Sequence, residues 1–260
     1  MFSFSTEVTS SQITSDNPLF QRTLKAYTLI AEKTYGDVLE IGCGEGYGLD
    51  FICKNANSVT VIDKSKSVLD EIKRKHPKTT ILNQKIPPLN NLKDNSFDII
   101  ISFQVIEHIK DATLFIQEIH RILKPDGKAF ITTPNSLKTV ARNPWHYKEY
   151  NYSEINDLIK NYFEDYSVNG IQGNKKTDIY YLKNKQSVER LLRLDIFKIQ
   201  YKIPATLLKI PYEVVNRINR NKLLKKNTSL VNSITLEDYS LTEYSKDTLD
   251  FFCIMNKKSN

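Results

Sequence analysis

Short apolar runs and helically spaced apolar positions alternate along the first half of the chain. Residues 17–33 repeat apolar side chains three and four positions apart, which predicts a helix with Pro18 at its first position and Asp16 or Asn17 as the cap. After residue 37 the pattern predicts strands and helices in turn, with strands at 38–41, 59–62, 80–82, 97–103 and 128–133, and helices at 49–53, 68–72 and 112–123. This alternation is typical of an α/β fold in which helices cover a parallel sheet.

The second half of the chain adds further elements with a less regular spacing. A helix is predicted at 153–162 with an N-cap in the stretch 153–156, followed by a strand at 163–171 and a closing strand at 248–255. Between residues 181 and 226 two stretches have apolar side chains at helical spacing. The first contains Val188, Leu191, Leu192, Phe197 and Ile199, and the second Val214, Val215, Ile218 and Leu223.

Residues 37–48, DVLEIGCGEGYG, join a short apolar strand directly to alternating glycines. Such a turn lets the backbone approach a ligand closely, so a nucleotide-like molecule is expected there. The glycines are Gly42, Gly44 and Gly46, which do not match the G-x-G-x-x-G spacing of dinucleotide sites. Glu40 precedes them inside the strand and favours a cationic ligand over a pyrophosphate. A sulfonium cofactor with an ammonium group fits this pattern better than a diphosphate.

Asp63 ends the next predicted strand, about 20 residues after the glycines, where a carboxylate can accept hydrogen bonds from both hydroxyls of a ribose. The alternative is that Asp63 caps the helix that follows Ser65. Both the ribose contact and the cap would use the Asp63 carboxylate at this turn, so the two alternatives stay open.

Six ordered motifs between residues 34 and 166 resemble class I S-adenosylmethionine-dependent methyltransferases of the small-molecule or glycan type, close to methyltransferase type 11. They are the glycine motif 40–46, Asp63, the pair 83–84, and the segments 96–98, 104–108 and 123–127. The resemblance implies S-adenosylmethionine as cofactor. It also implies a Rossmann-like, doubly wound, seven-stranded sheet, mostly parallel, with an antiparallel last strand and a helical insertion between strands 6 and 7.

The resemblance also suggests which residues contact the cofactor. Gln84 is assigned to the adenine, with Asn83 as the competing residue, and Ser102, Phe103 and Gln104 line the methionine end because ligands gather beyond the carboxyl ends of such strands. The complete predicted cofactor set is Glu40, Gly42, Gly44, Gly46, Asp63, Lys64, Gln84, Ser102 and Gln104.

Two histidines raise different questions. Some methyltransferases of quinone precursors have an E-x-x-E-H cluster that can hold a metal, but here the first position is Gln104. We therefore predict no metal and a hydrogen-bonded structural role for His108. His146, in the loop 143–150, is the predicted general base for an oxygen or nitrogen acceptor; alternatively, it only packs or caps in the loop. Nearby aromatic residues form either an acceptor wall or part of the core: Trp145, Tyr147 and Tyr150.

The net charge of +7 is concentrated in one segment. Residues 181–226 contain twelve Lys and Arg against three acidic residues, a local balance of +9. Basic and apolar residues interleave there, which favours contact with an anionic membrane and a lipid-linked glycan or other membrane-associated acceptor. The alternatives are helices that dock on the sheet with solvated lysines, or a nucleic acid partner. Nucleic acid is disfavoured because residues 102–104 lack the N-P-P-aromatic motif of base amino-methyltransferases.

Composition and termini set the expected location and domain organisation. Three cysteines without a CxxC pair argue against a disulfide scaffold or zinc site and fit a reducing cytoplasm. Residues 1–15 do not resemble a signal peptide, and no apolar run approaches about 18 residues. We expect a cytoplasmic protein, at most peripheral at the inner face of the membrane. The expected parts are a helical lead-in (1–36), the cofactor-binding core (37–177), a basic helical insertion (178–247) and a closing strand (248–260).

These observations predict an enzyme that transfers a methyl group from S-adenosylmethionine to a small-molecule or glycan/lipid-linked acceptor, at oxygen. The alternatives are an RNA methyltransferase, a non-catalytic cofactor-binding scaffold, and a nicotinamide-dependent oxidoreductase. The glycine register and the segment 123–127 argue against the last of these.

Overall fold

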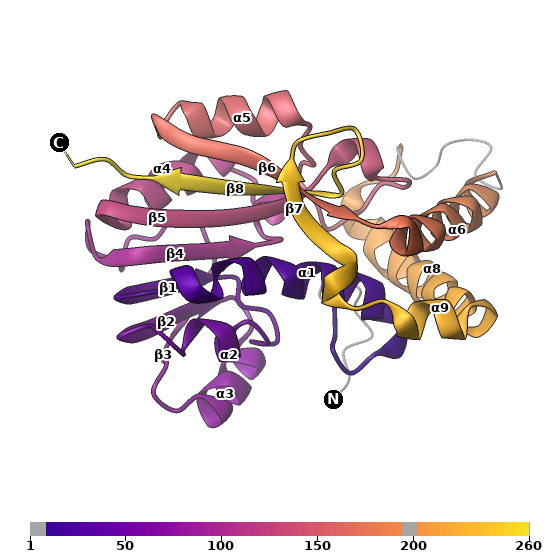
Figure 1. Ribbon diagram of the computed structural model, residues 1–260, viewed down its shortest axis with the longest axis horizontal. Coiled ribbons are helices and arrows are strands. Elements are labelled where there is room, and N and C mark those ends of the chain that lie inside the picture. Colours follow the sequence, from indigo (N-terminus) through magenta and orange to yellow (C-terminus); the bar gives the residue numbers. More distant parts are fainter. Residues whose placement is uncertain (1–8, 194–201, 260) are drawn as a thin grey trace.

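The computed structural model describes residues 9–193 and 202–259, which contain one mixed sheet in the strand order β3-β2-β1-β4-β5-β8-β6-β7 (Figure 1). The strands β1 to β5 are parallel, β8 lies antiparallel between β5 and β6, and β7 is antiparallel to β6. Their bounds are β1 Asp37–Ile41, β2 Ser58–Asp63, β3 Thr80–Asn83, β4 Phe97–Phe103, β5 Leu123–Pro134, β6 Asp165–Gly173, β7 Tyr239–Glu243 and β8 Asp250–Asn256.

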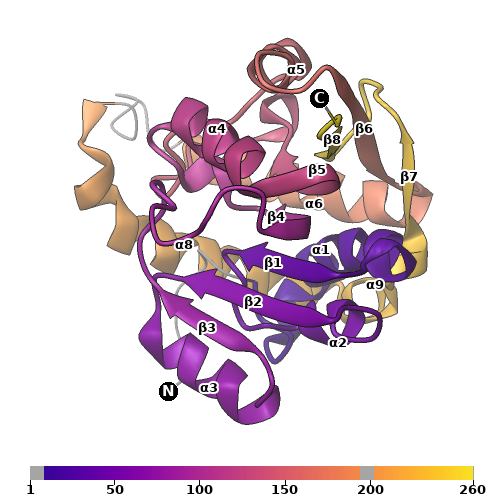
Figure 2. The same ribbon diagram turned by 90° about the vertical axis from the view of Figure 1, so that its left-hand side faces the viewer.

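Helices cover both faces of this sheet. Residues of α4 and α5 belong to one buried apolar cluster, and residues of α1, α2 and α3 belong to a second cluster on the other side (Figure 2). The bounds are α1 Asn17–Ile30, α2 Leu49–Ile52, α3 Lys66–Lys75, α4 Ala112–Ile122, α5 Tyr152–Lys160, α6 Lys175–Leu192, α8 Ala205–Lys226 and α9 Thr228–Ser233. The predicted α/β fold with a doubly wound sheet is therefore confirmed.

Two details of the sequence-based prediction are wrong. The sheet has eight strands, because the range 178–247 assigned to the helical insertion also contains β7, which pairs with β6 along its whole length. Only one of its five residues is buried, so this edge strand has little hydrophobic pattern. The N-cap of α5 is Asn151 rather than a residue of 153–156, because Asn151 and Glu154 form a reciprocal capping box.

The helices α6, α8 and α9 form the insertion and lie beyond the carboxyl ends of the parallel strands (Figure 1). Polar contacts attach them to the start of α1. The buried carboxylate of Asp16 pairs with Arg217 at 2.7 Å and with Arg220 at 2.9 Å. The side-chain amide of Asn17 donates to the carbonyls of Val231 and Ile234. Two residues of the first predicted amphipathic stretch, Phe197 and Ile199, lie outside the described residues.

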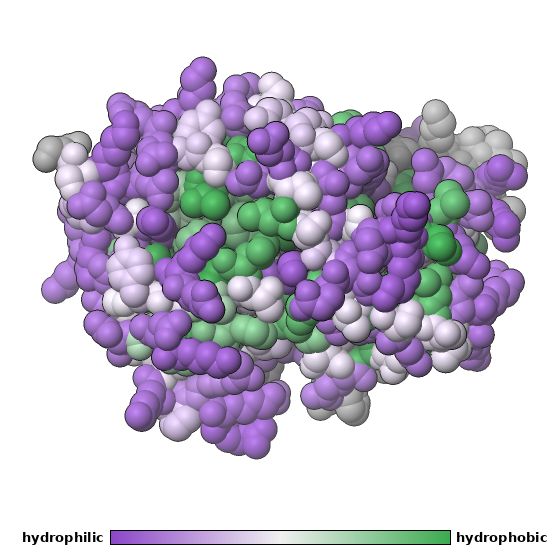
Figure 3. All heavy atoms as spheres, in the orientation of Figure 1, coloured by the Kyte–Doolittle hydropathy of each residue, from purple (hydrophilic) through white to green (hydrophobic). Residues whose placement is uncertain are grey.

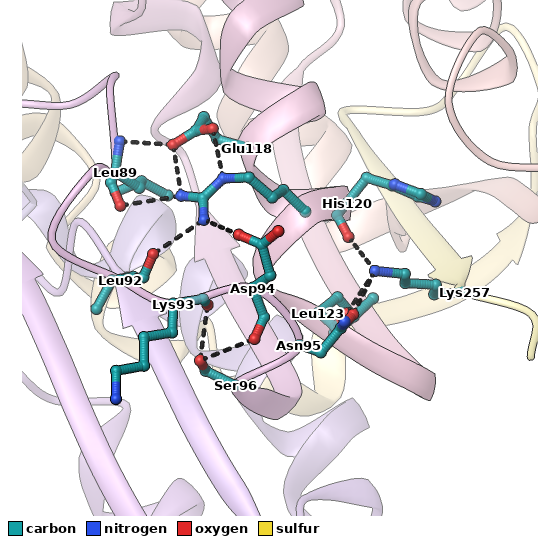
Figure 4. Close-up of polar contacts among 11 residues, drawn as sticks. Leu89, Leu92, Lys93, Asp94, Asn95, Ser96, Glu118, His120, Leu123 and Lys257 are labelled. Atoms are coloured by element: carbon teal, nitrogen blue, oxygen red, sulfur yellow. Dashed lines mark hydrogen bonds and ion pairs between the residues drawn. The ribbon is translucent and has the colours of Figure 1, made fainter.

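A polar network holds the loop between β3 and β4 against α4 (Figure 4). Arg121 forms ion pairs with Glu118 and Asp94 and donates to the carbonyls of Leu89 and Leu92, while the Glu118 carboxylate accepts from the Leu89 amide. These bonds satisfy loop carbonyls that have no partner in the sheet. Within the described ranges, no helix combines the length and the apolar content needed to span a membrane.

Candidate active site

The glycine turn after β1 has the backbone conformation that its sequence predicts. Gly42, Gly44 and Gly46 have φ values of 74°, 49° and 74°, in the left-handed region that side chains rarely adopt. A Cβ on Gly42 would meet Val105 Cγ2 at 2.5 Å, so substitution there would also require Val105 to move. The turn thus presents bare backbone at the carboxyl edge of the sheet, where ligands of α/β folds bind.

Glu40 lies under this turn and is 1% exposed. Its Oε1 accepts a 2.6 Å hydrogen bond from the hydroxyl of Tyr27, while its buried Oε2 has no hydrogen-bond partner among the described residues. Burial raises the pKa of Glu40 to about 7; the Tyr27 hydrogen bond opposes this shift and the nearby Asp63 carboxylate adds to it. The hydroxyl of Ser102, at the end of β4, is likewise buried without a partner in the described structure. A cationic ligand with hydrogen-bond donors would satisfy both groups, which is what the cofactor assignment requires.

Asp63 ends β2, beside the glycine turn. Its Oδ1 accepts a 2.8 Å hydrogen bond from the Ser65 backbone amide, which closes a turn ahead of α3. The N-cap of α3 is Ser65, so Asp63 does not have the capping role considered from the sequence. The same bond holds the carboxylate at the carboxyl end of the strand, where a ribose contact is expected. Lys64 follows at the surface. Their cofactor contacts stay predictions.

The two residues considered for the adenine are engaged within the protein. Gln84 accepts from the Asn91 side chain at 3.0 Å and donates to the Pro88 carbonyl at 3.4 Å. Asn83 donates to the Asp63 carbonyl at 3.0 Å. Binding of an adenine edge by Gln84 would therefore replace a bond to the loop at Asn91 or Pro88.

Gln104, directly after β4, has a φ of 58°, which is uncommon for a residue with a side chain. Its amide donates to Thr132 Oγ1 at 3.2 Å, and its interaction with the Asp250 carboxylate partly offsets the rise that burial causes in the pKa of Asp250. Asp250 is buried at the start of β8 and forms a 2.8 Å ion pair with Arg22 of α1. Strained residues held by such contacts concentrate at functional sites. The predicted methionine end of the pocket thus rests on a buried ion pair.

His146 is part of a hydrogen-bonded chain in the loop after β5. Its Nδ1 donates to Glu149 Oε1 at 2.6 Å, and its Nε2 accepts from the side-chain amide of Asn143 at 2.8 Å. The Asn143 oxygen accepts from the Trp145 amide, which orients the nitrogen toward the histidine. Glu149 also accepts from the hydroxyl of Thr139. A carboxylate on Nδ1 fixes the tautomer with a basic Nε2, the arrangement of histidine bases.

Glu107 and His108 lie against the same histidine, which the sequence could not show. Ligand atoms of Glu107, His108 and His146 lie within 4.8 Å of one another, a spacing that could hold a metal ion. Protein groups already contact each of them: Glu107 Oε2 accepts from Thr133, and His108 Nδ1 donates to the Trp145 carbonyl. Burial raises the pKa of Glu107 to about 7, partly offset by the nearby His146. The expectation of no metal stays a prediction.

The three aromatic residues expected to form an acceptor wall separate in the structure. Tyr150 is buried in the core, Tyr147 is 68% exposed, and Trp145 is half-buried. Trp145 contacts the insertion, since Lys209 Nζ lies 3.8 Å from the centre of its ring. The loop is held to the insertion a second time, because Arg142 donates to the carbonyl of Ile203. The start of α8 therefore borders the loop that contains His146.

Sequence reasoning missed several partners of the predicted residues. Glu149 stands three positions after His146, and that spacing could have indicated the pair. No sequence spacing indicates the contacts of Tyr27, Arg22 and Asp250, because their partners lie on other helices or strands.

Comparisons with known proteins agree with this geometry. A methyltransferase domain family matches residues 39–131. A probable S-adenosylmethionine-dependent methyltransferase of Mycolicibacterium smegmatis is 34% identical over 160 residues, 59% of this chain and 62% of that protein. A ubiquinone biosynthesis O-methyltransferase of Pelagibacter ubique is 37% identical over 101 residues, 38% of this chain and 42% of that protein. The chain thus spans less than two thirds of the length of these relatives.

The solved structures show the fold over a larger part of the chain. A possible histamine N-methyltransferase from Thermotoga maritima superimposes with a TM-score of 0.57 over 94% of this chain and 91% of its own, at 14% identity. The matched domain spans the glycine turn, Asp63 and the end of β4, which are the elements of the predicted cofactor site. Residues 39–131 therefore match a methyltransferase domain, and the chain is similar over 160 residues to a probable S-adenosylmethionine-dependent methyltransferase.

Proposed function

We propose that this protein transfers the methyl group of S-adenosylmethionine to a hydroxyl of a small-molecule or glycan/lipid-linked acceptor. The observation that carries the proposal is the unsatisfied, buried Oε2 of Glu40 beneath a glycine turn with bare backbone. A buried carboxylate oxygen without a donor is costly unless a ligand supplies one. The ammonium group of the cofactor is such a donor, whereas the pyrophosphate of a nicotinamide dinucleotide would repel Glu40.

The main contribution of this chain is to hold the cofactor and the acceptor in position for the reaction. When bound, the sulfonium of the cofactor supplies an activated methyl group. Glu40 and Ser102 would orient the methionine end, Asp63 the ribose, and the loop 143–150 the acceptor. Holding two reactants in line can remove about 7 to 11 kcal/mol of the barrier, more than a base usually contributes.

His146 is the group that would take the proton of the acceptor. The acceptor hydroxyl would replace the Asn143 amide at Nε2, and the Glu149 carboxylate would stabilise the imidazolium that forms. A base is needed for an oxygen acceptor because the hydroxyl loses its proton in the reaction. The names of the ubiquinone biosynthesis relatives, which are O-methyltransferases, are consistent with this choice.

The raised pKa of Glu40 predicts that cofactor binding releases a proton. Burial keeps Glu40 largely protonated below pH 7, and an ammonium ligand would favour its ionised form. We expect affinity for S-adenosylhomocysteine to rise between pH 5 and pH 7, by up to about tenfold per pH unit. Calorimetry in buffers of different ionisation enthalpy at pH 6 should show release of about one proton.

Glu107 provides the matched control, since burial also raises its pKa to about 7. Glu40→Gln should abolish the proton release while Glu107→Gln retains it. Equal release from both variants would assign the proton to another group.

The function itself is tested by titration of the chain with S-adenosylhomocysteine and, separately, with a reduced nicotinamide dinucleotide. Micromolar binding of the first alone supports the proposal. An acceptor screen with radiolabelled S-adenosylmethionine would then begin with hydroxylated sugars and lipid-linked glycans. Failure to bind S-adenosylhomocysteine would refute the proposal, and cofactor binding without transfer to any class of acceptor would favour a scaffold.

A further inference from the structure

The insertion exposes an unusual number of apolar side chains. On α8, five large apolar residues are between 48% and 77% exposed: Leu207, Ile210, Val214, Val215 and Ile218. On α6, Ile179, Leu182 and Leu191 are between 39% and 56% exposed. The spacing of three and four residues places most of the α8 set on one side of the helix. Scattered exposed apolar residues are ordinary, but a cluster on two neighbouring helices indicates a contact surface.

The helix α8 faces the rest of the protein mainly with polar residues, and its one buried apolar residue is Leu223 near the end of the helix. Arg217 and Arg220 turn inward to the buried Asp16, and Asn219 is 3% exposed and bonds to Ser187 and Asn184 of α6. The apolar stripe therefore points away from the core. This orientation argues against helices that merely dock their apolar faces on the sheet.

A groove of about 650 Å³ runs between α6 and α8. Among the described residues, its lining combines apolar side chains with four cations and no acidic residue; the cations are Lys183, Arg190, Lys222 and Lys226. Lys225 adds another exposed charge at the end of α8. Figure 3 shows hydrophobic side chains between hydrophilic ones over the end of the molecule where these helices lie.

We propose that this α6–α8 face, made of the exposed apolar residues, the groove cations and Lys225, docks on an anionic lipid bilayer. A surface with apolar side chains beside lysines fits a membrane interface. The apolar side chains insert among the acyl chains, and the lysines attract the lipid phosphates. An anionic partner is favoured because the charged side chains among the described residues of the groove are all cationic. A nucleic acid would meet the charges but leave the apolar stripe in water.

The α6–α8 face lies next to the loop that contains His146, so membrane docking would bring a lipid acceptor to this histidine. This step rests on the proposed function. The start of α8 borders the acceptor loop through Lys209 on Trp145 and through Arg142 on Ile203. A bilayer on the α6–α8 face would therefore hold a lipid-anchored acceptor beside the loop that contains His146. The acceptor class that follows is an amphiphile with a hydroxylated head group.

The test is co-sedimentation of the full chain with vesicles of phosphatidylcholine alone or mixed with phosphatidylglycerol. We expect binding only to the anionic vesicles, weakened by salt. Lys222→Gln, Lys225→Gln and Lys226→Gln together should lower partitioning about a hundredfold, about fivefold per charge. The control replaces three exposed lysines away from this face and should leave binding unchanged: Lys78 and Lys93, which precede β3 and β4, and Lys128, which lies within β5.

The apolar side chains are tested by Ile210→Ser combined with Ile218→Ser, which should weaken vesicle binding at least tenfold without changing the charge. The proposal would be overturned if the triple variant of Lys222, Lys225 and Lys226 partitioned to vesicles as well as the control variant of Lys78, Lys93 and Lys128. It would also be overturned if the serine variant bound vesicles normally, or if an RNA oligomer bound while vesicles did not. Titration with S-adenosylhomocysteine in each variant verifies folding. Vesicle binding by a wild type that does not bind this ligand would refute the proposed function alone.

Discussion

His146→Ala is expected to lower the turnover of methyl transfer to a hydroxyl acceptor by about a hundredfold to ten-thousandfold, the usual contribution of a general base. The physical reason is the chain from Glu149 through His146, in which the carboxylate bonded to Nδ1 leaves Nε2 as the proton acceptor. Affinity for S-adenosylhomocysteine should hardly change, because the predicted cofactor residues lie on β1 to β4 and the turns that follow these strands. The measurement is steady-state turnover with parallel cofactor titration.

His108 offers a matched control. Its ring lies 4.8 Å from that of His146, but its Nδ1 donates to the Trp145 carbonyl rather than to a carboxylate. His108→Ala should therefore affect turnover much less, and Glu149→Gln should lower turnover by weakening the orientation of His146. Unchanged turnover in His146→Ala would reject its role as base and leave His146 as a packing residue of the loop.

Asp63→Ala is expected to weaken binding of S-adenosylhomocysteine at least a hundredfold. Two hydrogen bonds from ribose hydroxyls to a carboxylate, at about 1.5 to 3 kcal/mol each, correspond to a loss of this size or more. The structure adds a complication, because Asp63 also accepts from the Ser65 amide. Loss of this turn hydrogen bond costs about 1 kcal/mol of the free energy of unfolding.

Asp63→Asn separates the two roles of this side chain. An asparagine oxygen still accepts from the Ser65 amide, so stability should be retained, while the loss of charge should reduce cofactor affinity. Asp70→Ala, which removes an exposed carboxylate on α3, is the control and should leave affinity unchanged. Wild-type affinity in Asp63→Asn would mean that Asp63 only stabilises the turn before α3.

The framework of the cofactor site could be predicted from local sequence. The apolar strand 38–41, the glycines at 42, 44 and 46 and the acid at 63 follow each other within one β-α-β segment, and their backbone geometry depends on residue type. Glycine permits the left-handed conformation, and a short apolar run favours a buried strand. These are properties of neighbours along the chain.

The acceptor side could be predicted only in part. His146 was identified by its place after β5, but the proximity of Glu107 and His108 follows from how the loop 143–150 packs on the turn after β4. The strand β7 was missed for a related reason, since an edge strand with one buried residue takes its conformation from pairing with β6. Both features depend on contacts between distant segments.

The sequence by itself determined that this chain contains a glycine turn, an acid at the end of the next strand and a segment with a charge balance of +9. Only the tertiary structure decided where those charges point. Arg217 and Arg220 turn to Asp16, about 200 positions earlier in the chain, while the apolar stripe of α8 faces outward. Periodicity shows that a helix has two faces, but which face is buried depends on the partners that folding brings to it.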